Sequence, residues 1–155
     1  VFPSHAPRAG ATLLEQLKTM LLILPPIFLL LGLLDVWVPR ETLMKHMGPA
    51  SGIKGAVIAF VLGSVAAGPL YGAFPIAAVL MKKGASFWNI LIFIGAWSTT
   101  KIPMFLFELN ALGVGFAVGR LAIDIPGIII IALAVQAITP KKEIERLYAA
   151  AASMD

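Results

Sequence analysis

The stretch GAVIAFVLGSVAAGPLYGAFPIAAVLM, residues 55–81, decides the fold, because it carries no charge over 27 residues. One straight helix of that length would measure about 40 Å at about 1.5 Å per residue, more than a hydrocarbon core of about 30 Å requires. Two prolines and two glycines fall between positions 66 and 75. We therefore predict a broken span of two half-helices, about 55–67 and 70–81. At the opened turn, freed backbone groups must face protein or a water-filled cavity.

The composition of the whole chain places it in a membrane. Of its 155 residues, 59% are apolar and 13% are charged, whereas soluble domains have roughly 45–50% apolar and about 25% charged residues. The excess apolar surface has to face lipid, so the lipid bilayer is the first expected partner. At this length we expect a single membrane domain over residues 1–155.

Several function classes are excluded by what the sequence lacks. It has no cysteine, and its two histidines, His5 and His46, lie far apart, so we expect no metal site, no cofactor and no enzymatic activity. The Lys and Arg residues are dispersed between apolar blocks rather than grouped with aromatic residues, which excludes a nucleic-acid partner.

The segments before residue 55 are expected to hold one more span. Residues 1–11 read as a loose leader, and 12–38 form the first span, in which Pro25 and Pro26 should produce a kink. Residues 39–54 are an interfacial segment, either a short helix with Leu43, Met44 and Met47 on one face or a simple connecting loop.

Two further spans and a tail follow residue 84. The span 85–109 is interrupted by the sequence WSTTKIP at 97–103, and the span 112–139 is apolar apart from a few polar positions. Residues 140–155 show apolar positions at helical spacing, which predicts an amphipathic tail on the membrane surface. The fold class expected is therefore all-α: a polytopic membrane protein with about four transmembrane spans, two of them interrupted, plus short interfacial helices.

The loop charges orient this four-span arrangement. Seven Lys and Arg residues fall on the side that holds both termini, and three fall on the other side: Arg40, Lys45 and Lys54. Positive residues concentrate in cytoplasmic loops, so both termini are predicted to be cytoplasmic.

The two breaks are the best candidates for a substrate pathway. Interrupted spans at matching depth point to a transporter's binding site, because half-helix ends present free amides and carbonyls; the alternative is a pair of plain proline kinks. Lys101 is the leading candidate within them, either facing a cavity or reaching to a nearby interface. The predicted pathway residues are Gly68, Pro69, Tyr71, Gly72, Ser98, Thr99, Thr100, Lys101 and Pro103.

A charge pair and two rows of small residues complete the candidates. Arg120 and Asp124 are four residues apart and hence on one helix face, where they can form a structural ion pair or a functional one. Small residues recur at four-residue spacing from Gly55, and Gly115 and Gly119 form a second such row. Both rows suit either internal packing or a subunit interface.

Three stretches of the sequence resemble a known family. GPLYGAFP (68–75), GAWSTTKIP (95–103) and the segment from LPP at 24–26 to DVWVPR at 35–40 are similar to those of the bacterial predicted-permease family that includes the ArsP organoarsenical efflux permeases. The resemblance implies a bacterial-type inner-membrane permease active in efflux. Larger members resemble two such halves in one polypeptide, so this chain is similar to a half-size member.

These observations lead to one main hypothesis and two alternatives. The main one is a half-size permease subunit, a homodimer or paired with a related half-permease. It would move a small anionic or metalloid-type solute or ion by alternating access. The alternatives are a small oligomeric channel, in which the breaks form a filter, and a non-transporting membrane assembly subunit.

Overall fold

The computed structural model describes residues 39–65 and 68–153, together with the isolated positions 18, 25, 29, 33 and 37. Every regular element in these ranges is a helix, which confirms the all-α part of the predicted fold class. Apart from those isolated positions, the predicted leader 1–11 and first span 12–38 lie outside the described residues, as do Ala66 and Ala67.

The interfacial segment begins with a helix, α2 (Arg40–Met47). Pro39 precedes its first residue, and the chain leaves it at Gly48, whose amide donates to Met44 O at 2.9 Å. Leu43 and Met47 are buried, so the helix alternative is correct for 40–47. A single 3-10 turn, η1 (Pro49–Ser51), then leads into α3 (Gly52–Val65). The bend between α2 and the segment Pro49–Val65 is 44°.

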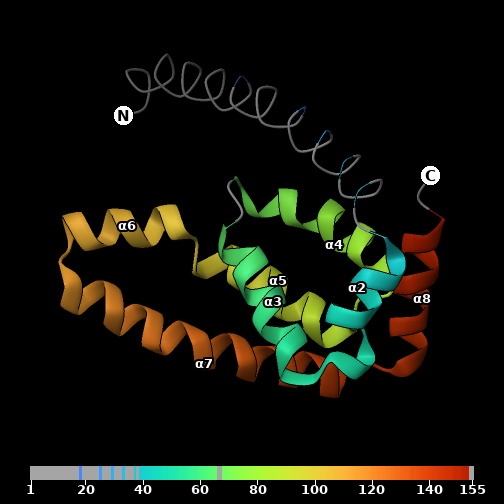
Figure 1. Ribbon diagram of the computed structural model, residues 1–155. Coiled ribbons are helices and arrows are strands. Elements are labelled where there is room, and N and C mark those ends of the chain that lie inside the picture. The colour runs from blue at the N-terminus through green and yellow to red at the C-terminus, as the bar shows by residue number, and fades with distance from the viewer. Residues whose placement is uncertain are drawn as a thin grey trace, which may run out of the picture.

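The uncharged stretch 55–81 folds back on itself. After α3 the chain turns through η2 (Leu70–Gly72) into α4 (Ala73–Lys82), and the amide of Ser86 donates to Met47 O at 2.8 Å. The end of α4 therefore lies beside α2, the helix that precedes α3, as Figure 1 shows. The two helices correspond to the predicted half-helices 55–67 and 70–81, but α4 runs back in the direction opposite to α3, so this segment is a helical hairpin rather than one broken span. Gly68 at φ 119° permits the turn, since that backbone conformation favours glycine.

Helix α5 (Phe87–Thr99) runs parallel to α3 and packs against it closely. A Cβ atom added at Gly63 would lie 2.4 Å from the carbonyl oxygen of Phe93, and one added at Gly55 would lie 2.5 Å from the Asn89 amide nitrogen. Ala59, between them, is fully buried. The small-residue row of α3 therefore serves internal packing, the first of its two interpretations.

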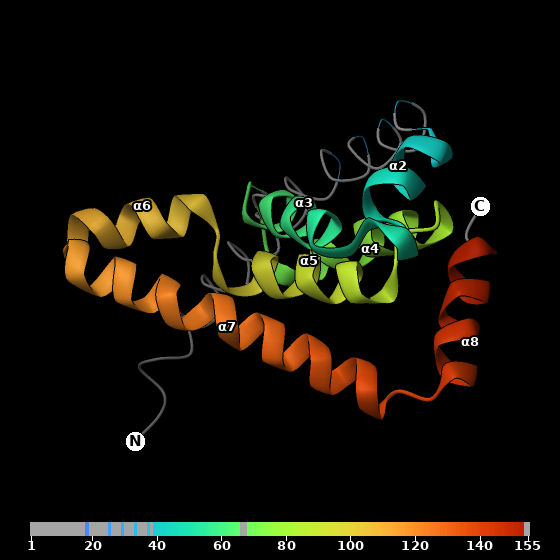
Figure 2. The same cartoon turned by 60° about the horizontal axis from the view of Figure 1, so that its bottom comes forward.

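The remaining helices extend away from this core and return. Helix α6 (Ile102–Ala111) follows α5, α7 (Val114–Ile138) runs back along both of them, and α8 (Lys141–Ala152) packs against α4 (Figures 1 and 2). In the described residues, two stretches are long and apolar enough to cross a membrane, Phe87–Ala111 and Val114–Ile138, or three if α2 and α3 count as one bent span. The described part of the chain thus gives two or three candidate spans where the sequence predicted three.

The hairpin gathers the positive charges at one end of the molecule. Tyr148 on α8 donates to Ala85 O at 2.6 Å, so α8 joins the end already formed by α2, the start of α3 and the end of α4. Of the ten Lys and Arg residues in 39–65 and 68–153, eight lie on these elements: Arg40, Lys45, Lys54, Lys82, Lys83, Lys141, Lys142 and Arg146. We call this the basic end. The sequence predicted that Arg40, Lys45 and Lys54 lie on the opposite side of the membrane from the later lysines. That prediction is wrong, because the hairpin reverses the chain direction.

Candidate functional site

The tip of the α3–α4 hairpin meets the break between α5 and α6. Helix α5 ends at Thr99 and α6 begins at Ile102, with Lys101 in an extended conformation between them. The Lys101 ammonium donates to Gly68 O, and the Trp97 indole N–H donates to Pro69 O at 3.2 Å. The structure therefore brings together the two motifs that the sequence analysis singled out.

Lys101 holds a positive charge in the middle of a candidate span. It lies within the 25-residue stretch Phe87–Ala111 and is half-buried. An ammonium has three N–H donors, and the bond to Gly68 O uses one of them. Across 39–65 and 68–153, no carboxylate forms an ion pair with it. Lys101 thus offers a positive charge and two further donors to a solute.

The neighbouring hydroxyl groups are mostly bonded within the protein. The Thr100 hydroxyl donates to Ala96 O at 3.1 Å. It also lies 3.0 Å from the Ser64 hydroxyl of α3, which is then the donor in that pair. The Thr99 hydroxyl donates to Gly95 O at 3.0 Å. Ser98 is exposed. In this conformation the Thr99 and Thr100 hydroxyls therefore help to pack the break rather than face a solute.

The other predicted pathway residues shape the backbone at the same place. Tyr71 lies exposed on η2, and Gly72 is buried with its amide donating to Pro69 O at 3.0 Å. Pro103 occupies the first turn of α6 and is exposed. With no N–H of its own, proline is well tolerated at that position.

Arg120 links three helices beside the break. Its Nε donates to Glu108 Oε2 at 2.8 Å, its Nη2 donates to Thr99 O at 3.0 Å, and its Nη1 lies 3.3 Å from Asp124 Oδ2. The Glu108 side chain, on α6, is only 5% exposed. The pair predicted from the spacing of Arg120 and Asp124 is therefore part of a larger cluster.

Glu108 is the site residue that sequence reasoning missed. The available signal was a carboxylate within an apolar segment, which is costly unless it is paired. The pair could be identified only once α7 was known to run back along α6.

Side-chain donors occupy the carbonyl oxygens that the breaks release. Gly68 O accepts from Lys101, Pro69 O from Trp97, and Thr99 O from Arg120. Because lipid offers no donors, such bonds allow an irregular backbone to persist inside a membrane protein. A cavity of about 250 Å³ adjoins the break and is lined by Leu70, Gly95, Ser98 and Thr99 together with apolar residues of α5 and α7.

The row formed by Gly115 and Gly119 differs from the row on α3. A Cβ atom added at either position would meet nothing within 4 Å, and Phe116 and Val118 beside them are half exposed. No described helix covers this face of α7, so its role in a subunit interface stays a prediction.

Comparison with known protein families gives a match that covers most of the chain. The sequence model of an ArsP family, described as "Predicted permease", matches residues 8–154. No curated protein and no solved structure matches the chain. The family match covers nearly the whole chain and confirms the resemblance carried by the motifs at 68–75 and 95–103.

Proposed function

This chain belongs to the ArsP predicted-permease family, and from that premise we propose that it is a half-size permease subunit with its pathway at the hairpin tip and the α5–α6 break. The proposal rests mainly on one observation, the joining of the two breaks by Lys101 and Gly68 in the middle of a candidate span. Elements that meet there can separate and rejoin by exchanging a few hydrogen bonds, which suits alternating access.

The expected solute is small and anionic, or a metalloid-type species that presents oxygen atoms. Lys101 supplies a positive charge without a carboxylate partner in the described ranges. The first turn of α6 adds its free amides and the positive end of its helix dipole. A cation would meet repulsion from Lys101, so we do not expect one to be carried alone.

We further propose that the basic end is cytoplasmic, since positive residues concentrate on that side. The Leu112–Gly113 turn, at the far end of α6 and α7, carries no charge. The C-terminus then lies in the cytoplasm. If 12–38 crosses the membrane, as its sequence predicts, the N-terminus lies on the opposite side, contrary to the prediction of two cytoplasmic termini.

The cavity at the break is too open and too small to enclose a pathway within one subunit, so we propose a dimer of this chain or a pair with a related half-permease. The uncovered face of α7 around Gly115 and Gly119 is the proposed contact, because small residues allow helices to approach closely in lipid. Because eight of the ten described Lys and Arg residues lie at the basic end, both copies are expected to insert with that end on the same side of the membrane rather than antiparallel.

The test is a flux assay with purified protein in vesicles, using phosphate, arsenate and arsenite as solutes. Lys101→Met should abolish flux of the transported solute, Lys101→Arg should retain part of it, and the matched control Lys142→Met, at an exposed lysine of the basic end, should leave it unchanged. Wild-type flux in Lys101→Met would refute the proposed site. Saturable flux supports a permease, whereas ohmic conductance would favour the channel alternative.

A further inference from the structure

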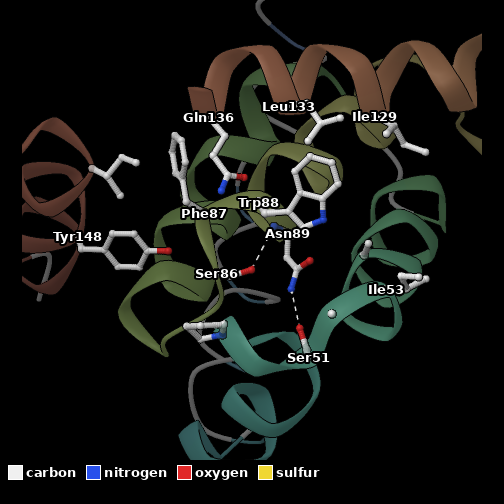
Figure 3. A pocket seen from close by; sticks show the side chains of 14 residues that line it. Ser51, Ile53, Ser86, Phe87, Trp88, Asn89, Ile129, Leu133, Gln136 and Tyr148 are labelled. Atoms are coloured by element: carbon white, nitrogen blue, oxygen red, sulfur yellow. Dashed lines mark hydrogen bonds between the residues drawn. The ribbon is translucent and has the colours of Figure 1, made fainter. Parts of the chain in front are cut away.

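A large groove lies at the basic end, away from the proposed pathway. It has a volume of about 990 Å³ and is lined by residues of η1, α3, α5, α7 and α8 (Figure 3). Asn89 contributes to its wall, although only 1% of this residue is exposed. This groove has no part in the function proposed above.

The orientation of the Asn89 amide is fixed by its neighbours. The Ser51 hydroxyl donates to Gly48 O at 2.6 Å, so its oxygen is left to accept. The Asn89 amide nitrogen donates to that oxygen at 3.0 Å and to Met47 O at 2.8 Å (Figure 3). A flipped amide would place its oxygen against Met47 O, which cannot donate.

As a consequence, Asn89 Oδ1 is a buried acceptor that has no partner among the described residues. Gly55 makes this arrangement possible, because a Cβ atom there would lie 2.0 Å from the Ser51 hydroxyl and 2.5 Å from the Asn89 nitrogen. Buried polar groups in native proteins nearly always have a partner. The group that completes this site must therefore donate a hydrogen bond.

The surroundings indicate what kind of molecule carries that donor. The rim includes Ile53, which is 85% exposed, and Leu133, which is 55% exposed; in a membrane protein such apolar rims face lipid tails. Trp88 and Tyr148 also line the groove (Figure 3), and these residue types are enriched at the level of lipid headgroups.

Positive charges close to the groove suit a phosphate. Lys54 follows the rim residue Ile53, and Lys141 opens α8, which contributes Ile144 and Tyr148 to the lining. Both lysines are exposed. We infer that the groove holds a phospholipid of the basic-end leaflet whose headgroup donates a hydrogen bond to Asn89 Oδ1, with its phosphate near these lysines and its tails along the apolar rim.

The experiment compares lipid retention by the purified full chain in native mass spectrometry. The probes are phosphatidylethanolamine, whose ammonium donates hydrogen bonds, and phosphatidylcholine with the same acyl chains, whose headgroup cannot. We expect wild type to retain the ethanolamine lipid about two- to tenfold better, the range of one hydrogen bond. Phosphatidylglycerol forms a separate arm, which reports a hydroxyl donor together with the lysine charges.

Variants locate the effect. Leu133→Trp adds bulk to the groove lining at a residue that is not a hydrogen-bond partner of Asn89, and Asn89→Leu removes the acceptor; both should bring the ethanolamine-to-choline ratio close to one. The matched control Asn110→Leu, at the exposed asparagine of α6, should keep the wild-type ratio. Equal retention of the two lipids by wild type, or an unchanged ratio in Leu133→Trp, would overturn the inference. The comparison of the two lipids in wild type does not depend on any variant, so it tests the inference even if Asn89→Leu fails to fold.

Discussion

Gly63→Ala should weaken the contact between α3 and α5 on which the hairpin depends. The added Cβ atom would lie 2.4 Å from Phe93 O, 2.9 Å from Ala96 Cβ and 3.0 Å from Trp97 N. Two of these atoms belong to the backbone of α5 and cannot turn aside, so the helices must separate. Overpacking of this kind costs about 1–3 kcal/mol of unfolding free energy.

The same substitution at Gly127, within α7, is the matched control. A Cβ atom there meets nothing within 4 Å, and replacing a helical glycine by alanine stabilises by roughly 0.5–1 kcal/mol. The two variants should therefore move stability in opposite directions. Thermal unfolding in one detergent should give a melting temperature about 2–12 °C lower for Gly63→Ala, from about 2–4 °C per kcal/mol at this chain length. An unchanged or raised melting temperature would refute the close α3–α5 packing.

Three further predictions test the charge cluster, the hairpin and α8. Arg120→Met should destabilise the protein by about 3–5 kcal/mol in chemical unfolding, because it leaves the buried Glu108 carboxylate without its ion-pair partner. Adding Glu108→Gln should restore much of that loss. Equal unfolding free energies for the single and the double variant would contradict the pairing. Lys54→Cys and Lys82→Cys, introduced singly into this cysteine-free chain, should react with an impermeant maleimide from the same side of the membrane, whereas a straight 55–81 span would place them on opposite sides. Burial raises the pKa of Tyr148 to about 12 from 10.0, so its contribution to stability should be complete below about pH 10 and fall as the pH rises toward 12; in Tyr148→Phe that fall should be absent from the unfolding curve.

The sequence predicted the helical elements far better than their directions. The range expected for the last span, 112–139, differs from α7 by only a residue or two at each end, because a long apolar run and its flanking turns determine such a helix locally. The hairpin was not predictable in the same way. Gly68 and Pro69 identify a break, but whether the chain continues or reverses depends on α3 packing against α5, a contact between residues about 30 positions apart.

For the candidate site, the sequence likewise identified the residues but not their partners. The two motifs and Lys101 stand out, because glycine, proline and a cation are unusual in an apolar stretch. The partners of these residues are not encoded by local spacing. Glu108 joins Arg120 only because α7 runs back along α6, and Ser64 reaches Thr100 only because α3 and α5 are parallel.

The two cations within the apolar region differ in a way that separates structure from function. Arg120 has two carboxylates and a carbonyl oxygen around it, so its charge is neutralised by partners within the protein, as expected of a group that fixes helices in place. Lys101 has one carbonyl oxygen and, in the described ranges, no carboxylate. A charge left in this state in a membrane is stabilised only by water or by a bound anion. Replacement of Arg120 should therefore reduce stability most, whereas replacement of Lys101 should reduce flux while the fold persists.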